Sequence, residues 1–176
     1  MKDNKTNQLT NVLFIIYLIA LFWIIVFKFN LPFSNIGNMR SLNLIPFSEP
    51  LILNNKVSYN ELIMNVVIFV PLGIYVGILY KKWTSIKKIF LFFLISLICE
   101  VLQYILAIGA SDITDIINNT LGGIIGLIIY KVIEKIFNNS AKAQKFINII
   151  AQIGTTVVIL LLLLLRINNV WIFRGL

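Results

Sequence analysis

The feature that most constrains this chain is a series of long apolar stretches separated by short polar segments. An α-helix needs roughly 20 apolar residues to cross the hydrocarbon core of a bilayer. Five stretches fit that length, at residues 11–29, 62–80, 86–108, 112–137 and 146–167. Because lipid offers the backbone no hydrogen-bond partners, such stretches are expected to be helical. The sequence therefore predicts an all-α integral membrane bundle of about five transmembrane helices.

Composition supports this class of protein and argues against functions that depend on histidine. The chain is 59% hydrophobic and 12% charged, whereas a soluble domain carries about 25% charged residues. It contains no histidine, which is the commonest general base and metal ligand. We therefore expect no cofactor and no metal site, and we interpret Cys99 as core filler. We predict a single membrane domain over residues 1–176.

The distribution of basic residues predicts an orientation. With the N-terminus placed in the cytoplasm, ten of the 15 Lys and Arg residues fall on the inner side. Cytoplasmic loops carry this excess in membrane proteins. The lysines are dispersed at helix ends, which favours anionic lipid over nucleic acid as the charged partner. The first helix is expected to stay uncleaved, because no small-residue cleavage site follows it.

The connection at residues 30–61 is long and unusually apolar, with "RSLNLIPFSEPLIL" at its centre. Prolines 32, 46 and 50 argue against a continuous helix there. Irregular backbone at membrane depth is tolerated only where protein or a water-filled cavity covers it. We therefore expect a partly re-entrant segment that folds back onto the outer end of the bundle.

Strongly polar side chains gather at the predicted outer end of the helices. Glu100 precedes Gln103 and Tyr104 at the spacing of one helix face, and Ser96 continues that stripe. The next helix carries a second polar face at the same level. The candidate site residues from all segments are Arg40, Asn43, Asn65, Glu100, Gln103, Asp112, Asp115 and Asn119.

Each of these features also has a structural interpretation. "SYNE" at residues 58–61 is a capping-box pattern, and Asp112 and Asp115 suit the start of a helix. Gly73 with Gly77, and Gly122 with Gly126, are spaced for close helix packing. Glu100 lies far from any predicted helix end, so capping does not explain it. Arg40, Gln103 or Asn119 could hold it in a structural network.

Four motifs together are similar to those of a known family. "RSLNLIPF" at 40–47, "NVVIFVPLG" at 65–73, "EVLQ" at 100–103 and "SDITDIINNTLGGIIG" at 111–126 occur in this order. The set resembles the VanZ-like family of small membrane proteins, over roughly residues 40–135. Residues 11–29 and 146–167 are flanking transmembrane helices outside that core.

The resemblance implies which residues matter and what the protein does. The family pattern maps onto Asn43, Asn65, Glu100, Gln103, Asp112, Asp115 and Asn119. Many relatives carry an arginine just before the aspartates, where this chain has Gly109 and Ala110, so Arg40 is the remaining nearby cation. The resemblance implies a multi-pass protein of the bacterial cytoplasmic membrane with a role in resistance to teicoplanin or related lipid-tailed glycopeptides.

Three functions remain open at this stage. A non-catalytic protein could bind a lipid-tailed glycopeptide or a lipid-linked cell-wall precursor in the outer polar pocket, besides contacting membrane lipids. A membrane enzyme could act on a lipid headgroup, with Glu100 as general acid or base and Asp112 and Asp115 positioning Mg²⁺ or substrate. A transporter is the least favoured, because no internal repeat is visible. We expect a non-catalytic binder.

Overall fold

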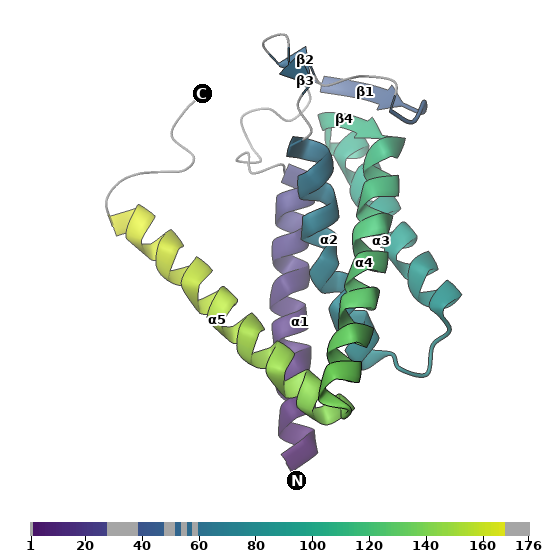
Figure 1. The fold of residues 1–176 in the computed structure, drawn as a ribbon. Helices are drawn as coiled ribbons and strands as arrows, with labels where there is room; N and C mark the ends of the chain where they lie inside the picture. The colour runs from purple at the N-terminus through teal and green to yellow at the C-terminus, as the bar shows by residue number, and fades with distance from the viewer. Residues whose placement is uncertain (1, 28–38, 48–51, 54–55, 58–59, 168–176) are drawn as a thin grey trace.

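Five long helices make up most of the computed structural model (Figure 1), which describes residues 2–27, 39–47, 52–53, 56–57 and 60–167. They are α1 (Lys2–Phe27), α2 (Asn60–Leu79), α3 (Ser85–Leu106), α4 (Ile113–Phe137) and α5 (Ser140–Ile167). Each of the five is long and apolar enough to cross a membrane. The prediction of an all-α membrane bundle is confirmed.

Local signals set the ends of α3 and α4. The side chain of Thr84 accepts a hydrogen bond from the Lys87 amide at 3.4 Å and caps the start of α3. Ala107 ends that helix in the left-handed conformation, with φ of 51°. Asn138 ends α4 in the same way, with φ of 45°. Asn tolerates this conformation better than Ala does, because its side chain can bond locally.

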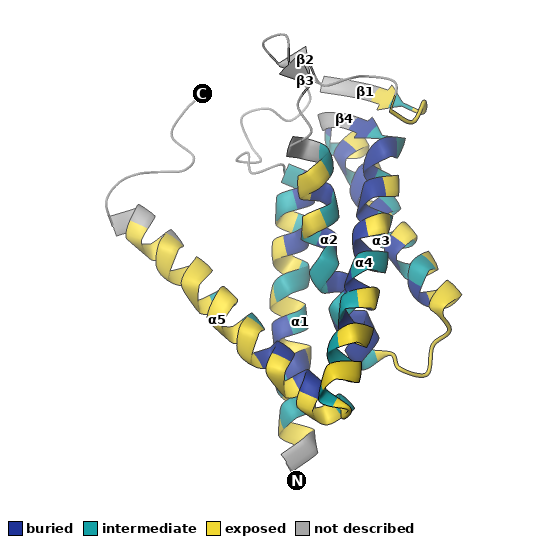
Figure 2. Cartoon of the chain, in the orientation of Figure 1, coloured by how far each residue is buried: buried dark blue, intermediate teal, exposed yellow. Residues whose placement is uncertain are grey.

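Glycines allow α2 and α4 to approach closely. A Cβ on Gly126 would overlap the carbonyl oxygen of Val70, and one on Gly73 would overlap the carbonyl oxygen of Gly123. Backbone contact of this kind is the use that small residues have between membrane helices. The predicted packing role of these glycines is confirmed. The facing sides of α2, α3 and α4 hold much of the buried surface (Figure 2).

A tyrosine from α1 is hydrogen-bonded to α2 beside a proline. The Tyr17 hydroxyl donates to the carbonyl of Ile68 at 2.8 Å and accepts from the amide of Leu72 at 3.1 Å. In an uninterrupted helix these two backbone groups would bond to each other. They flank Pro71, whose ring disturbs the preceding turn. Tyr17 therefore supports the backbone of α2 beside Pro71.

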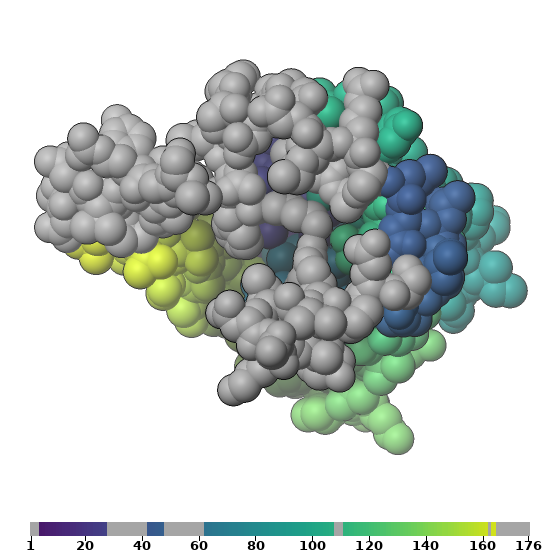
Figure 3. All heavy atoms as spheres, turned by 90° about the horizontal axis from the view of Figure 1, so that it is seen from above, coloured from purple at the N-terminus to yellow at the C-terminus, as the bar shows by residue number. Residues whose placement is uncertain are grey.

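Short strands lie at one end of the bundle, and we did not predict them. β1 (Met39–Asn43) pairs in parallel with β4 (Ile108–Asp112), while β2 (Ile52–Leu53) pairs with β3 (Lys56–Val57). β4 joins α3 to α4, so β1 lies across the end of these helices (Figure 1). Figure 3 looks down on this end and shows residues 42–47 against α3. Through β1, the described residues 39–47 of the apolar connection thus fold back onto the bundle.

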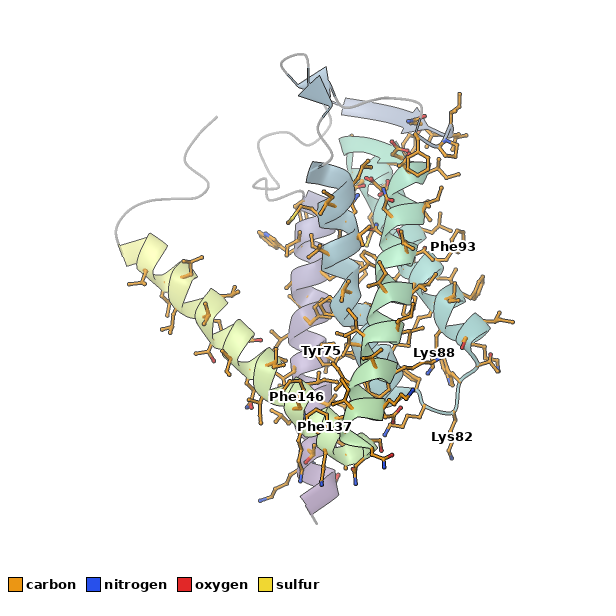
Figure 4. All side chains as sticks on the ribbon, viewed as in Figure 1. Tyr75, Lys82, Lys88, Phe93, Phe137 and Phe146 are labelled. Atoms are coloured by element: carbon orange, nitrogen blue, oxygen red, sulfur yellow. The ribbon has the colours of Figure 1, made fainter. Side chains whose placement is uncertain are left out.

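The two ends of the bundle differ in charge. We call the end with β1 and β4 the strand end. The opposite end is called the lysine end. It carries the α2–α3 connection with Lys81 and Lys82, and the start of α5 with Lys145. Figure 4 shows Lys82 and Lys88 near it. Under the positive-inside rule the lysine end is predicted to be cytoplasmic.

The fifth helix packs against the bundle only near its start. Thr10 of α1 and Asn148 of α5, both almost fully buried, bond to each other through Thr10 Oγ1 and the Asn148 amide group at 2.9 and 3.1 Å. Beyond this contact α5 diverges from α1, and most of its described side chains are exposed (Figure 2). The second half of α5 is therefore suited to contact lipid.

Candidate functional site

The acidic side chains of the strand end meet where α3, β4 and α4 join. Glu100 is 2% exposed, and its Oε2 accepts a hydrogen bond from the backbone amide of Asp112 at 3.0 Å. The expectation that Glu100 has no role at a helix start was wrong. It binds the main chain of the residue that caps α4, because β4 turns back over the end of α3. The prediction that these acids share one level is confirmed.

Asp112 is the N-cap of α4 and also binds the apolar connection. Its Oδ1 accepts from the amide of Thr114 at 2.7 Å, and its Oδ2 accepts from Nδ2 of Asn43 at 3.2 Å. Asn43 Oδ1 in turn accepts from the amide of Ile45 at 3.1 Å. The amide of Phe47 donates to Thr114 Oγ1 at 3.0 Å. The capping interpretation of Asp112 is confirmed, and the same carboxylate anchors β1.

A second acid joins two helices. Asp115 lies in the first turn of α4, and its Oδ1 accepts from Nδ2 of Asn65 on α2 at 2.6 Å. Both side chains are buried. A short hydrogen bond between a carboxylate and an amide is strong in surroundings with little water. It fixes the spacing of α2 and α4 just above the glycine contacts.

Two buried amides extend the polar cluster towards α1 and α3. Asn119 Nδ2 donates to Ser96 Oγ at 2.9 Å, and Gln103 Nε2 donates to the carbonyl oxygen of Ile25 at 2.7 Å. Asn119 and Gln103 are no more than 1% exposed. These bonds complete a cluster that spans α1, α2, α3 and α4. We call this set the polar cluster: Asn65, Ser96, Glu100, Gln103, Asp112, Asp115, Asn118 and Asn119.

Hydrogen-bonding capacity remains inside the polar cluster. Among the described residues, buried Gln103 Oε1, Asn118 Nδ2 and Asn119 Oδ1 have no hydrogen-bond partner. Buried polar atoms in folded proteins are normally bonded, and leaving one unbonded costs about 1–3 kcal/mol. The polar cluster therefore holds two buried acceptors and one buried donor whose hydrogen-bonding capacity is unused among the described residues.

Several details differ from the sequence analysis. Tyr104 was expected on the Glu100 face, but it is exposed, because the buried stripe of α3 runs through residues 96, 99, 100 and 103. Asn118 and Thr114 were not selected as site residues. They are buried because α4 packs against both α2 and α3, so more than one of its faces is interior. The sequence signal that could have identified them is the presence of polar residues on more than one face of the otherwise apolar α4.

The backbone places Arg40 beside Gly109, where the resemblance implies an arginine in many relatives. In the parallel pair of β1 and β4, Arg40 lies opposite Gly109 and Asn43 lies opposite Asp112. The side chain of Arg40 is outside the described part of the structure, so its predicted contact with Glu100 stays a prediction. The predicted capping box at residues 58–61 also includes positions outside that part.

An apolar groove adjoins the polar cluster. It lies between α1 and α3 and has a volume of about 430 Å³. The lining is entirely apolar: Ile15, Leu18, Ile19, Phe22, Trp23, Val26, Phe27, Leu102 and Leu106. Along α1 it extends over roughly 18 Å, from the 1.5 Å rise per residue. Gln103 of the polar cluster donates a hydrogen bond to the carbonyl of Ile25 on α1, and its sequence neighbour Leu102 and the Ile25 neighbour Val26 both line the groove.

The described residues include no cluster of side chains suited to bind a metal ion. No group of three or more His, Cys, Asp or Glu side chains is arranged to hold an ion within that part of the chain. Asp112 and Asp115 instead bond to Asn43, Thr114 and Asn65. Their observed contacts are with protein donors that order the strand end.

Comparison with known proteins places these features in a family. The VanZ/LLP1 family model matches residues 14–138, from within α1 to the end of α4. Protein VanZ of Enterococcus faecium is 36% identical over 160 residues, which cover 88% of this chain and 93% of that protein. No solved structure matches the chain. This multi-pass membrane protein, with its polar cluster at the strand end, therefore belongs to the VanZ/LLP1 family.

Proposed function

We propose that this protein lowers the susceptibility of a bacterium to teicoplanin and related lipid-tailed glycopeptides by binding an amphiphile at the strand end. The polar cluster would take the headgroup and the groove between α1 and α3 would take the acyl tail. The observation that carries this proposal is the hydrogen bond from Gln103 of the polar cluster to the carbonyl of Ile25, beside the groove residues Leu102 and Val26. Ligand sites commonly combine apolar walls with a few polar groups in this way.

The unsatisfied atoms of the cluster support a polar ligand group. Gln103 Oε1 and Asn119 Oδ1 can accept hydrogen bonds, and Asn118 Nδ2 can donate one. Sugar hydroxyls both donate and accept, so the sugar of a glycopeptide or of a lipid-linked cell-wall precursor matches this set. The protein that is 36% identical is called Protein VanZ, and the motifs shared with that family suggest the teicoplanin role.

The predicted orientation of the protein in the membrane determines on which side the polar cluster lies. The strand end faces outward if the lysine end is cytoplasmic, as the distribution of basic residues predicts. We therefore place the protein in the cytoplasmic membrane of a bacterium, with the polar cluster in the outer leaflet. Glycopeptide drugs and lipid-linked wall precursors are present on that side.

The tail component can be tested with a variant that fills the groove. Ile19 lines the groove and is 66% exposed, so a larger side chain there does not disturb the core. Ile153 on α5 is 60% exposed and lines none of the described cavities, which makes it a matched control. Purified wild type, Ile19→Trp and Ile153→Trp are titrated with teicoplanin and with vancomycin by calorimetry in nanodiscs.

We expect the wild type to bind teicoplanin in clear preference to vancomycin. Ile19→Trp should weaken teicoplanin binding by about tenfold or more. The indole would occupy the space proposed for the acyl tail, and such steric overlap costs about 1–3 kcal/mol. Ile153→Trp should bind as the wild type does. Equal binding of both drugs, or no effect of Ile19→Trp, would contradict the tail component. If a lipid-linked precursor binds and teicoplanin does not, the drug is not the ligand.

A further inference from the structure

A separate pocket opens at the lysine end, away from the polar cluster. It has a volume of about 640 Å³ and lies between α1, the α2–α3 connection and α5. Its polar and aromatic lining comprises Asn7, Asn11, Tyr80, Lys81, Lys82, Trp83 and Gln144. A smaller cavity of about 200 Å³ shares Asn7, Lys81 and Gln144 with it and adds Lys145. The two cavities form one polar region beside the start of α5.

A buried hydrogen-bond network fixes the floor of this region. Gln144 Nε2 donates to Asn7 Oδ1 at 2.9 Å and to Thr10 Oγ1 at 2.8 Å. Thr10 also bonds to Asn148, so α1 and α5 are held together directly below the pocket. Because the Asn7 oxygen accepts from Gln144, its amide nitrogen presents N–H donors to a ligand. The donors are therefore positioned before any ligand arrives.

The charge of the region is positive. Lys81 lines both cavities, Lys82 lines the larger one and Lys145 lines the smaller one. No Asp or Glu is present among the described residues that line either cavity. Lysine ammonium groups and amide N–H donors are together the usual partners of a phosphate group. The region therefore suits an anion with several acceptor oxygens.

The apolar and aromatic part of the lining indicates a lipid as the source of that anion. Ile78 and Leu79, the last residues of α2, form one wall. The ring centroids of Tyr80 and Trp83 lie 4.6 Å apart, and both residues line the pocket. Aromatic residues of this kind lie at the headgroup level of bilayers, and basic pockets between cytoplasmic helix ends bind anionic headgroups. A soluble phosphate has no apolar part that could contact these side chains.

We propose that this pocket binds the phosphate headgroup of an anionic membrane lipid, through Lys81, Lys82 and the amide of Asn7. The bound headgroup bridges α1, the α2–α3 connection and α5. It thereby links the diverging fifth helix to the rest of the bundle. This site is independent of the polar cluster, because it lies at the opposite end of the helices (Figure 1).

The test measures lipid binding to the full-length protein. Wild type, the double variant Lys81→Gln/Lys82→Gln and the control Lys87→Gln/Lys135→Gln are purified and titrated with phosphatidylglycerol or phosphatidylcholine by native mass spectrometry. All four lysines are exposed, so neither variant removes a core side chain, and the two variants lose equal charge. Lys87 and Lys135 line neither cavity. Far-UV circular dichroism checks that both variants are folded.

The wild type should bind phosphatidylglycerol in preference to phosphatidylcholine. The pocket variant should lose about thirtyfold in affinity for phosphatidylglycerol, while the control stays within about threefold of wild type. Equal loss in both variants, or no preference for phosphatidylglycerol, would overturn the proposal. Inorganic phosphate is added as a competitor, and displacement of the lipid at equal concentrations would show a soluble-phosphate site instead.

Discussion

Glu100 holds the main chain at the entrance of α4, since its Oε2 accepts from the Asp112 amide at 3.0 Å. This contact needs an oxygen but not a charge. Glutamine at position 100 retains an acceptor oxygen, whereas alanine leaves the Asp112 amide without its partner. The two substitutions therefore separate the folding role of Glu100 from any role of its carboxylate.

We expect Glu100→Ala to lower the free energy of unfolding by about 1–3 kcal/mol, because a buried donor loses its acceptor. Glu100→Gln should lower it by less than about 1 kcal/mol. Unfolding by SDS in mixed micelles, followed by circular dichroism, measures both. Equal losses in the two variants would show that the charge, rather than the hydrogen bond, stabilises the strand end.

The polar face of α4 was predictable from spacing, because Asp115 and Asn119 are four residues apart on a helix of regular period. The hydrogen-bond partners of these residues were not predictable. Asn65 comes from α2 and bonds Asp115 at 2.6 Å, and which polar residues meet across helices depends on rotation and depth. The contact from Asn43 to Asp112 joins residues 69 positions apart. It requires the parallel pairing of β1 and β4, which no local pattern encodes.

At the scale of elements, α2 and α4 form the closest contact of the bundle. A Cβ on Gly126 would overlap the Val70 carbonyl oxygen, whereas a Cβ on Gly154 of α5 would meet nothing within 4 Å. Gly126→Ala should force the helices apart, with a loss of about 1–3 kcal/mol, the usual result of overpacking. Gly154→Ala should be neutral or stabilising by up to about 1 kcal/mol, because alanine favours helix.

The yield of folded protein and SDS unfolding midpoints measure both glycine variants. A Gly126→Ala protein as stable as Gly154→Ala would contradict the close packing of α2 and α4. The glycine spacing itself was visible in the sequence. Which of the glycines face another backbone was not, since Gly77 instead lies against the ring of Tyr130.

The contact between α1 and α2 predicts a coupling between Tyr17 and Pro71. Tyr17→Phe removes both hydrogen bonds of the hydroxyl and should lower stability by about 1–2 kcal/mol. In a Pro71→Ala background the backbone of α2 can bond to itself again. The loss caused by Tyr17→Phe should therefore be smaller there. A double-mutant cycle on SDS unfolding measures the coupling, and equal losses in the two backgrounds would argue against it.

At the scale of the whole molecule, the charge asymmetry between the ends predicts orientation. In a cysteine-free Cys99→Ala background, a cysteine at Lys56 should react with an impermeant maleimide added to intact cells. A cysteine at Lys82 should react only after the membrane is permeabilised. Native Cys99 is fully buried, so its removal leaves the surface unchanged. The reverse labelling pattern would place the polar cluster in the inner leaflet.

The number and position of the membrane helices followed from hydropathy, because the bilayer imposes a length on each span. Their arrangement did not follow. The divergence of α5 depends on where the Thr10, Gln144 and Asn148 contacts stop, and the strand end depends on pairing between distant segments. The ends of the molecule therefore carry the features that sequence patterns alone did not predict.

The most direct measurement expresses wild type and Glu100→Gln at equal membrane abundance in a glycopeptide-sensitive host and compares teicoplanin with vancomycin susceptibility. We predict selective protection against teicoplanin by the wild type. We also predict its loss in Glu100→Gln, because the carboxylate is part of the polar cluster that would take the headgroup, although that variant is expected to fold. Undiminished protection by Glu100→Gln would show that the carboxylate acts only in folding. No protection by the wild type would contradict the proposed function itself.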